Sequence, residues 1–529
     1  MSRKGPRLPV RVLGLRSEYA AEPLGLGVSR PRFSWKVETQ VRDWRQRAYE
    51  IEVTDADSGK PVWSSRRQSS PESVLVAYGG PPLHSRDRVR WRVRVWDEAG
   101  NVSDWSQESR LEIGLLEHSD WEAAFISPGW DEDATQTSPS PYLRREFEVG
   151  AEVVRARLYV TAVGVYEVEI NGSRVGEEFL APGWTSYQNR LLYQTHDVTA
   201  LVATGENAIG ATLADGWARG YLGSLGARNV YSDHLALLAQ LEITLADGTA
   251  QRVVSDEKWR AAEGPIRAAD LYNGESYDAR LELHGWTMPG YPDGDWSAVR
   301  IVEWDKGTLQ APKGPPIRRM EELRPTSITT SPSGKTIVDF GQNLVGYIRF
   351  EVEAPTGTEV HLRHAEILHE GELYTAPLRT AKATDAYICK GGGVETYEPR
   401  FTFHGFRYAE IEGWPGALST EDLVAVVCYS AMDRTGQFRC SDELVNRLHE
   451  NIVWSMKGNF VGVPTDCPQR DERLGWTGDI QVFGPTASYL YDVTGILSSW
   501  LEDLWADQYS NGSVPWVIPD GRVFPESHG

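Results

Sequence analysis

The sequence predicts a multi-domain chain in which three β domains in series precede an all-α domain. Apolar and polar residues alternate in many short segments up to about residue 430. Near residue 434 the spacing of apolar residues becomes helical. Links rich in Pro and Gly, such as APKGPP at 311–316, separate the β segments. The length of 529 residues agrees with about three or four domains.

The first predicted domain covers residues 1–115 and consists of short strands. Tyr49, Ile51 and Val53 alternate with polar residues, as do the apolar residues of VRWRVRVW at 89–96. This period of two is typical of a half-buried strand. The segment WRVRVWDEAGNVSDWS resembles the last hairpin of a fibronectin type III-like β-sandwich, so we expect that fold for residues 1–115.

The second and third predicted β domains cover residues 116–310 and 311–432. In the second, alternation runs from Leu158 to Ile170 and ends at Asn171-Gly172, a strong hairpin signal. In the third, alternating apolar residues of YIRFEVE at 347–353 predict another half-buried strand. We expect each of these domains to be a β-sandwich.

The last predicted domain, residues 433–529, is helical. Five apolar residues between 444 and 456 lie at helical spacing, and Ser441 is placed to cap that helix. The segment 494–507 carries a wide apolar stripe after a Thr494 cap. Between them, Pro485 is expected to end, start or kink a helix. Such helices would expose their apolar stripes without partners, which drives association.

Composition and charge exclude several classes of protein. Lys and Arg total 54 and Asp and Glu total 75, a formal charge of −21 that disfavours nucleic acid and anionic membranes as partners. The four cysteines form no CxxC pair, and no run of 18 apolar residues occurs. We therefore expect a cytoplasmic protein without metal or cofactor. The 20 Trp suit either sugar stacking or β-sandwich cores.

One segment concentrates groups that can do chemistry. VPTDCPQRDERLGWTGD, residues 463–479, is interrupted by prolines and glycines, so we expect a loop whose charges converge on a ligand. The alternative is a solvated charged loop that is tied by salt bridges. The charged and aromatic residues of this segment are Asp466, Arg470, Asp471, Glu472, Arg473, Trp476 and Asp479.

Two further groups of residues carry weaker signals. HAEILHE at 364–370 lacks the HExxH zinc pattern, and on a strand His364 and Glu366 would face away from His369, so we expect no metal site. Asp215 and Trp217 in LADGWARGYLG predict either an accessory sugar site or a structural β-turn.

The long motif provides a resemblance to a known family. VPTDCPQRDERLGWTGDIQVFGPTASYLYD resembles the active-site signature of bacterial α-L-rhamnosidases, glycoside hydrolase family 78. VYEVEINGSRVG, DFGQNLVGYIRF and FTFHGFRYAEI resemble the β domains of that family. The resemblance implies a fibronectin-like domain, β-sandwich domains and the start of an (α/α)6 barrel. It also implies inverting hydrolysis of terminal α-L-rhamnosides, with rhamnose-containing saccharides as the binding partners.

The resemblance assigns a role to each residue of the motif that it matches. Glu472 falls on the general acid, and Asp466 and Asp479 fall on carboxylates that bind sugar hydroxyls. Arg470 falls on a ligand of the sugar or of a neighbouring carboxylate, and Trp476 on the apolar wall. An apolar wall suits rhamnose, because this deoxy sugar carries a methyl group.

The resemblance leaves one catalytic position without a match. The family's general base is a glutamate from the later half of the barrel, and neither Glu502 nor Glu526 matches it. We expect a fragment or a form without this machinery, with little or no activity. A non-catalytic carbohydrate-binding β protein is the alternative, and an inverting glycosidase of another type is disfavoured by the motif.

Overall fold

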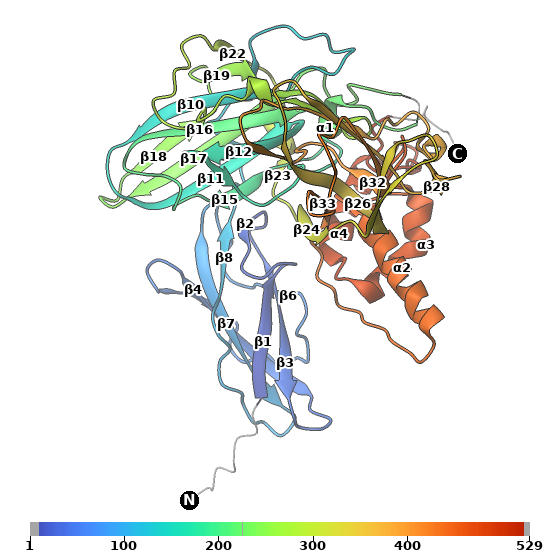
Figure 1. The fold of residues 1–529 in the computed structure, drawn as a ribbon. Coiled ribbons are helices and arrows are strands. Elements are labelled where there is room, and N and C mark those ends of the chain that lie inside the picture. Colours follow the sequence, from blue (N-terminus) through green and yellow to red (C-terminus); the bar gives the residue numbers. More distant parts are fainter. Residues whose placement is uncertain (1–9, 225, 523–529) are drawn as a thin grey trace, which may run out of the picture. The chain divides into compact units, whose positions relative to one another are not determined.

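The computed structural model describes residues 10–224 and 226–522 and divides into two compact units. One contains the chain up to Glu122 together with Gln310–Lys313, and the other contains 123–309 and 314–529. Strands dominate up to Ser430, where the only α-helix in the described residues has four residues, α1 (Gly216–Arg219). The longer helices follow, in orange and red in Figure 1. The predicted change from strands to helices near 434 is confirmed.

The first unit is an immunoglobulin-like pair of sheets. A three-stranded sheet has the order β1-β3-β6, and a five-stranded sheet has the order β2-β8-β7-β4-β5. The alternating residues predicted for strands 49–53 and 91–95 lie in β4 and β7, which pair antiparallel with Ile51 opposite Val93. Phe33 stacks on Trp91 with ring centroids 4.3 Å apart, in the core between the sheets. The strands are β1 (Val10–Ser17), β2 (Leu24–Leu26), β3 (Arg32–Thr39), β4 (Gln46–Asp55), β5 (Pro61–Ser64), β6 (Val76–Ala77), β7 (Arg88–Asp97) and β8 (Ser109–Ile113).

The second unit begins with an eleven-stranded sheet of order β13-β12-β16-β10-β19-β22-β9-β17-β11-β15, with β18 beside β17. The alternating segment from Leu158 forms β11 and β12, and its apolar residues lie in one core. Asn171 and Gly172 both have positive φ, 51° and 77°, and connect β12 to β13 as the hairpin turn that the sequence predicts. The strands are β9 (Ile126–Pro128), β10 (Pro141–Val149), β11 (Val153–Val163), β12 (Val165–Ile170), β13 (Ser173–Val175), β15 (Gln194–Asp197), β16 (Gly205–Ala214), β17 (Ala236–Leu245), β18 (Ala250–Val254), β19 (Arg260–Glu263) and β22 (Ser297–Ile301).

A ten-stranded sheet follows, of order β20-β21-β30-β27-β32-β26-β33-β24, with β25 and β31 also beside β26. Its central strand β26 pairs with β32 and β33, and Ile348, Phe350 and Val352 of this strand are buried in a second core. The strands are β20 (Ile266–Asp270), β21 (Gly274–Asp278), β24 (Ile317–Leu323), β25 (Ser327–Thr330), β26 (Thr336–Glu353), β27 (Glu359–Ala365), β30 (Thr384–Ile388), β31 (Val394–Tyr397), β32 (His404–Glu412) and β33 (Leu423–Ser430). Shorter elements are β14 (Leu191–Leu192), β23 (Leu309–Gln310), β28 (Leu368–His369), β29 (Glu372–Leu373), β34 (Phe460–Val461), β35 (Val463–Pro464), η1 (His118–Asp120), η2 (Ala279–Leu281), η3 (Lys306–Thr308) and η4 (Ala376–Leu378).

The helices α2 (Glu443–Asn459), α3 (Thr477–Leu490) and α4 (Thr494–Ala506) correct two expectations about helix caps. Asp442 rather than Ser441 caps α2, because its carboxylate accepts from two free backbone N–H groups of the first turn. Thr494 is the first residue of α4 and not its cap. Pro485 lies inside α3. No described helix is both long and apolar enough to cross a membrane.

A buried ion pair holds α4 against the eleven-stranded sheet region. Arg190 Nη1 lies 2.8 Å from Asp503 Oδ1, and both side chains are almost fully buried. Arg190 Nη2 also lies 3.0 Å from Glu502. Burial raises the pKa of Asp503 to about 7 in spite of the arginine. The helical region is therefore anchored to the β domain by side chains that are costly to separate.

The other faces of these helices are exposed and apolar, as the sequence predicts for a stripe without partners. Leu444 and Leu448 of α2, Val482 and Tyr489 of α3, and Trp505 of α4 are exposed. Such a surface favours association, and association of this chain stays a prediction.

Glu275 gives a testable dependence of stability on pH. Its side chain is buried in β21, and burial raises its pKa from 4.5 to about 8. Because the folded state holds this proton more tightly than the unfolded state, the Glu275 contribution to stability is greatest below pH 4.5 and falls as the pH rises to about 8. In urea unfolding at pH 5 to 9, Glu275→Gln is expected to flatten this dependence relative to the unchanged chain. The exposed-site control Glu353→Gln should leave it unaltered, and equal slopes for all three proteins would contradict the assignment.

Candidate active site

The motif forms a closed loop followed by the start of α3. The loop begins at Thr465, directly after the hairpin β34–β35. It ends at Trp476, the residue before α3. Asp466 closes the loop from within, since its backbone N–H donates to Leu474 O and its Oδ1 accepts from Leu474 N at 2.9 Å. Asp479 therefore lies in the first helical turn and not in the loop that the sequence predicts.

Arg470 brings two of the predicted carboxylates together. Its Nη2 lies 3.2 Å from Asp466 Oδ2 and its Nε lies 3.0 Å from Glu472 Oε2. One carboxylate oxygen of Asp466 and one of Glu472 lie within 4.8 Å of each other. Trp476 Nε1 donates to Glu472 Oε1 at 3.1 Å. Burial raises the pKa of the Asp466 carboxyl. Four of the five residues that the resemblance selects thus form one bonded group.

A pocket of about 530 Å³ lies next to this group. Asp466 and Asp479 line it from opposite ends of the motif, and Ser455, Asn459 and Thr465 are its other polar lining residues. Glu472 and Trp476 do not line the pocket. Glu472 is linked to it by Arg470, which also contacts the lining residue Asp466. The pocket is thus lined by Asp466 and Asp479 and not by Glu472. The apolar part of the wall comes from Met456, Phe460, Pro464, Ile480, Val482 and Phe483.

The loop rests on a buried arginine. Arg473 has a positive φ of 49° and is 3% exposed. Its guanidinium donates to Leu271 O and Phe403 O at 2.8 Å and to two carbonyls of the loop. Tyr272 Oη donates to Glu472 O at 2.7 Å from the same side. Burial lowers the pKa of Arg473. The ten-stranded sheet region thereby fixes the backbone that carries Glu472.

Two residues of the site were not predicted from the sequence. Arg379 Nη1 lies 2.9 Å from Glu472 Oε2, and Thr380 donates through both its N–H and its hydroxyl to Asp471. They follow η4, about ninety residues before the motif in sequence. No spacing or periodicity in the sequence connects the two segments.

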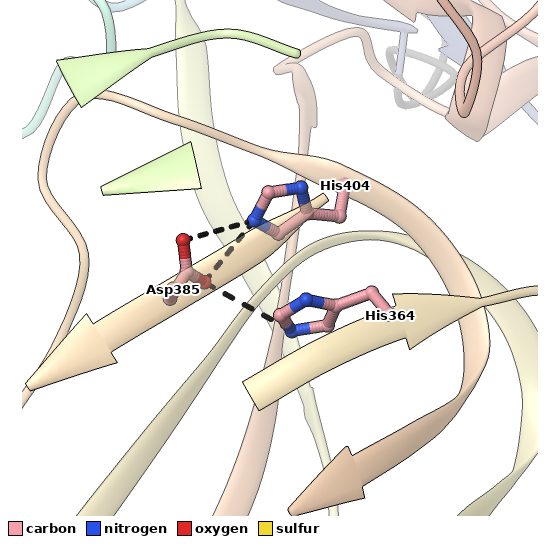
Figure 2. A group of neighbouring side chains, drawn as sticks. All are labelled: His364, Asp385 and His404. Atoms are coloured by element: carbon pink, nitrogen blue, oxygen red, sulfur yellow. Dashed lines mark hydrogen bonds and ion pairs between the residues drawn. The ribbon is translucent and has the colours of Figure 1, made fainter. Parts of the chain in front are cut away.

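A buried His–Asp–His cluster lies beside the segment that carries Arg379. Figure 2 shows Asp385 facing both His404 and His364 from one side, and the two histidines lie on neighbouring strands. His404 Nε2 lies 3.1 Å from both Asp385 oxygens, and the two imidazole rings stack at 4.2 Å. His364 Nδ1 lies 2.9 Å from Ala383 O, and because a carbonyl only accepts, Nδ1 carries the proton. Burial lowers the pKa of His364 to about 3, so this imidazole is neutral.

The three residues of HAEILHE do not act together. His364 belongs to the cluster, Glu366 accepts from Gln469 Nε2 of the motif at 2.8 Å, and His369 lies in the separate strand β28. The cluster fixes Ala383 and thereby the end of the segment after Arg379.

The LADGWARGYLG segment is structural. Trp217 is buried and stacks with Trp184, and buried Asp215 pairs with Arg219 and Arg228. An accessory sugar site is therefore wrong for these side chains, which have no face open to a ligand.

Four family descriptions match the chain in order. They are a Rha78A-like N-terminal immunoglobulin domain at residues 12–117, the α-L-rhamnosidase N-terminal domain at 151–321, the bacterial α-L-rhamnosidase concanavalin-like domain at 329–429 and the bacterial α-L-rhamnosidase six-hairpin glycosidase domain at 433–528. The chain belongs to the bacterial α-L-rhamnosidase family. A curated α-L-rhamnosidase of Streptomyces avermitilis is 36% identical over 96% of this chain.

Solved α-L-rhamnosidases have the same fold. The native enzyme of Aspergillus terreus superposes with a TM-score of 0.93 at 44% identity, over 97% of this chain and 60% of that one. The Streptomyces avermitilis enzyme, solved in complex with L-rhamnose, gives 0.93 at 36% identity, over 96% of this chain and 66% of that one. This chain thus spans about two thirds of the length of the Streptomyces rhamnosidase and 60% of the Aspergillus one.

Proposed function

We propose that this chain carries the sugar-binding and proton-donating part of an α-L-rhamnosidase, which hydrolyses terminal α-L-rhamnosides with inversion. The observation that carries the proposal is the bonded group of Asp466, Arg470, Glu472 and Trp476 beside a pocket that Asp466 and Asp479 line. The relatives named above support the reaction class.

In this proposal Glu472 is the general acid. It transfers a proton to the glycosidic oxygen as the bond to the anomeric carbon breaks, while a water adds to the opposite face of the sugar. An inverting pair of carboxyls is about 6.5–9.5 Å apart because the water must fit between them. One carboxylate oxygen of Asp466 lies within 4.8 Å of one oxygen of Glu472, which is nearer than an inverting pair requires. We therefore assign Asp466 to sugar binding and not to the base.

The remaining roles follow from the pocket. Asp466 and Asp479 accept hydrogen bonds from rhamnose hydroxyls, and Arg470 orients both Asp466 and Glu472. The apolar wall of the pocket faces the ring and methyl group of the sugar, and Trp476 acts through its hydrogen bond to Glu472 Oε1. These assignments place polar contacts on one side of a deoxy sugar and apolar contacts on the other, which is the division its chemistry requires.

The general base has no assigned residue in this chain. Glu502 lies 3.0 Å from Arg190 in the anchor of α4, a structural position. Glu526 lies outside the described residues. Helices α2–α4 would form the start of an (α/α)6 barrel, and the first unit would be a fibronectin type III-like sandwich. A non-catalytic carbohydrate-binding protein is the second candidate, which the polar and apolar lining of the pocket would also suit. Cytoplasmic placement is part of the proposal and rests on the sequence alone.

Binding of L-rhamnose tests the proposal without turnover. Asp479→Asn is expected to weaken L-rhamnose binding about 10- to 100-fold, because a hydrogen bond to a charged group contributes about 1.5–3 kcal/mol. Titration calorimetry of residues 1–529 at neutral pH measures this change. Glu450→Gln, on an exposed part of α2, is the matched control and should bind as the unchanged chain does. Equal affinity of Asp479→Asn and the control would exclude Asp479 from the sugar site.

A further inference from the structure

A second cation lies on the proposed acid, and it comes from the β part of the molecule. Arg470 Nε and Arg379 Nη1 lie 3.0 Å and 2.9 Å from the same oxygen, Glu472 Oε2. The other oxygen, Oε1, accepts only the neutral indole N–H of Trp476 among the contacts described. The two oxygens of this carboxyl are therefore unequal, since one carries both charge partners and the other has none.

The segment that carries Arg379 is held in one conformation from several sides. Arg379 itself has a positive φ of 58°, and Ala383 has one of 45°. Non-glycine residues keep such angles only where their surroundings enforce them. The two hydrogen bonds from Thr380 to Asp471 hold the backbone next to Arg379. His364 donates twice to Ala383 O, from its backbone N–H and from its ring, and so holds Ala383.

Arg379 contrasts with the other arginine that supports the loop. Its side chain is 44% exposed, whereas Arg473 is buried and bonded to four carbonyls. An exposed ion pair adds little to folding stability. A strained and anchored segment holds Arg379 against the Glu472 carboxylate, although this ion pair adds little to stability. The combination points to a role for Arg379 at the active site.

We propose that Arg379 is a positioning residue for Glu472, which it holds through Oε2 so that Oε1 is the oxygen that donates the proton. When the proton leaves Oε1 for the glycosidic oxygen and the bond to the anomeric carbon breaks, the carboxylate left behind has two cations already in place on Oε2. The inference rests on the proposed function. It means that the active site is formed by two parts of the chain, the loop before α3, which carries Glu472, and the β domain, which carries Arg379.

The test uses a spectroscopic readout that needs no turnover. Fluorotryptophan is placed at position 476 of residues 1–529, and its ¹⁹F resonance reports the carboxyl that its N–H contacts. Arg379→Gln is expected to shift this resonance, and Arg379→Lys to restore it for the most part, because lysine keeps the positive charge. Arg363→Gln, an exposed neighbour that contacts Thr375, is the matched control and should leave the resonance in place.

The outcomes separate this inference from the proposed function. An unshifted resonance in Arg379→Gln, a shift of equal size in Arg363→Gln, or no recovery with Arg379→Lys would each overturn it. Failure of residues 1–529 to bind L-rhamnose would count against the proposed function and would leave the ¹⁹F result unaffected. Arg379→Gln should keep the L-rhamnose affinity within about 2-fold of the unchanged chain, since its guanidinium contacts the acid rather than the pocket.

Discussion

Purified residues 1–529 are expected to hydrolyse an aryl α-L-rhamnoside far below the ordinary enzymatic range of about 1–10³ s⁻¹. Glu472 can supply the proton, but inversion also needs a water activated from the opposite face. Asp466 is too near Glu472 for that task, and Glu502 is engaged by Arg190. General base assistance contributes about 10²–10⁴-fold, and incomplete positioning of the sugar costs more.

The control is a fusion of this chain to the part of the Streptomyces avermitilis rhamnosidase that it does not span. That fusion should recover turnover, and Glu472→Gln within it should abolish most activity on substrates with poor leaving groups. Activated aryl leaving groups need less protonation and should be affected less. Turnover of about 1 s⁻¹ or more by residues 1–529 alone would show that the base lies within this chain.

Replacement of Arg473 by Met should cost about 3–5 kcal/mol of the free energy of unfolding, as for other buried charged groups that lose their partners. The change leaves four carbonyls without their donor under the loop, among them those of Leu271 and Phe403. Arg473→Lys should not recover the loss, because one ammonium cannot reach the positions of a planar guanidinium. Urea unfolding monitored by tryptophan fluorescence measures the change.

Arg407→Met is the matched control for this prediction. Arg407 pairs with Asp339 at 2.8 Å, and its side chain is 39% exposed, so its loss should cost about 1 kcal/mol or less. A cost for Arg473→Met no greater than that of the control would show that the loop does not depend on the buried arginine. A large cost with unchanged L-rhamnose binding would separate its role in stability from any role at the sugar.

Local patterns predicted the architecture well, since they depend on neighbours in sequence. The alternation from Leu158 formed β11 and β12, and the Asn171-Gly172 turn formed where it was expected. Helix ends were less predictable. Asp442 and not Ser441 caps α2, and Thr494 is the first residue of α4 and not its cap. Each outcome depends on a few hydrogen bonds that spacing does not determine.

The site was predictable only where its residues are close in sequence. Asp466, Arg470, Glu472 and Trp476 are separated by a few positions, and a single loop brings them together. Arg379 contacts Glu472 from a distant segment, and strand pairing over long separations assembles the His364–Asp385–His404 cluster that supports this segment, which no local pattern encodes. For Trp217 the sequence left a sugar site and a structural turn open, and its burial and stacking on Trp184 decide for a structural role.

The most direct test of the central claim is a crystal structure of residues 1–529 grown with L-rhamnose. The account predicts the sugar in the pocket beside α3, with hydroxyls on Asp466 and Asp479 and the methyl group toward the apolar wall. Glu472 should lie on the side of the anomeric carbon, with Arg379 and Arg470 on its Oε2. L-rhamnose bound elsewhere on the chain, with this pocket unoccupied, would contradict the account.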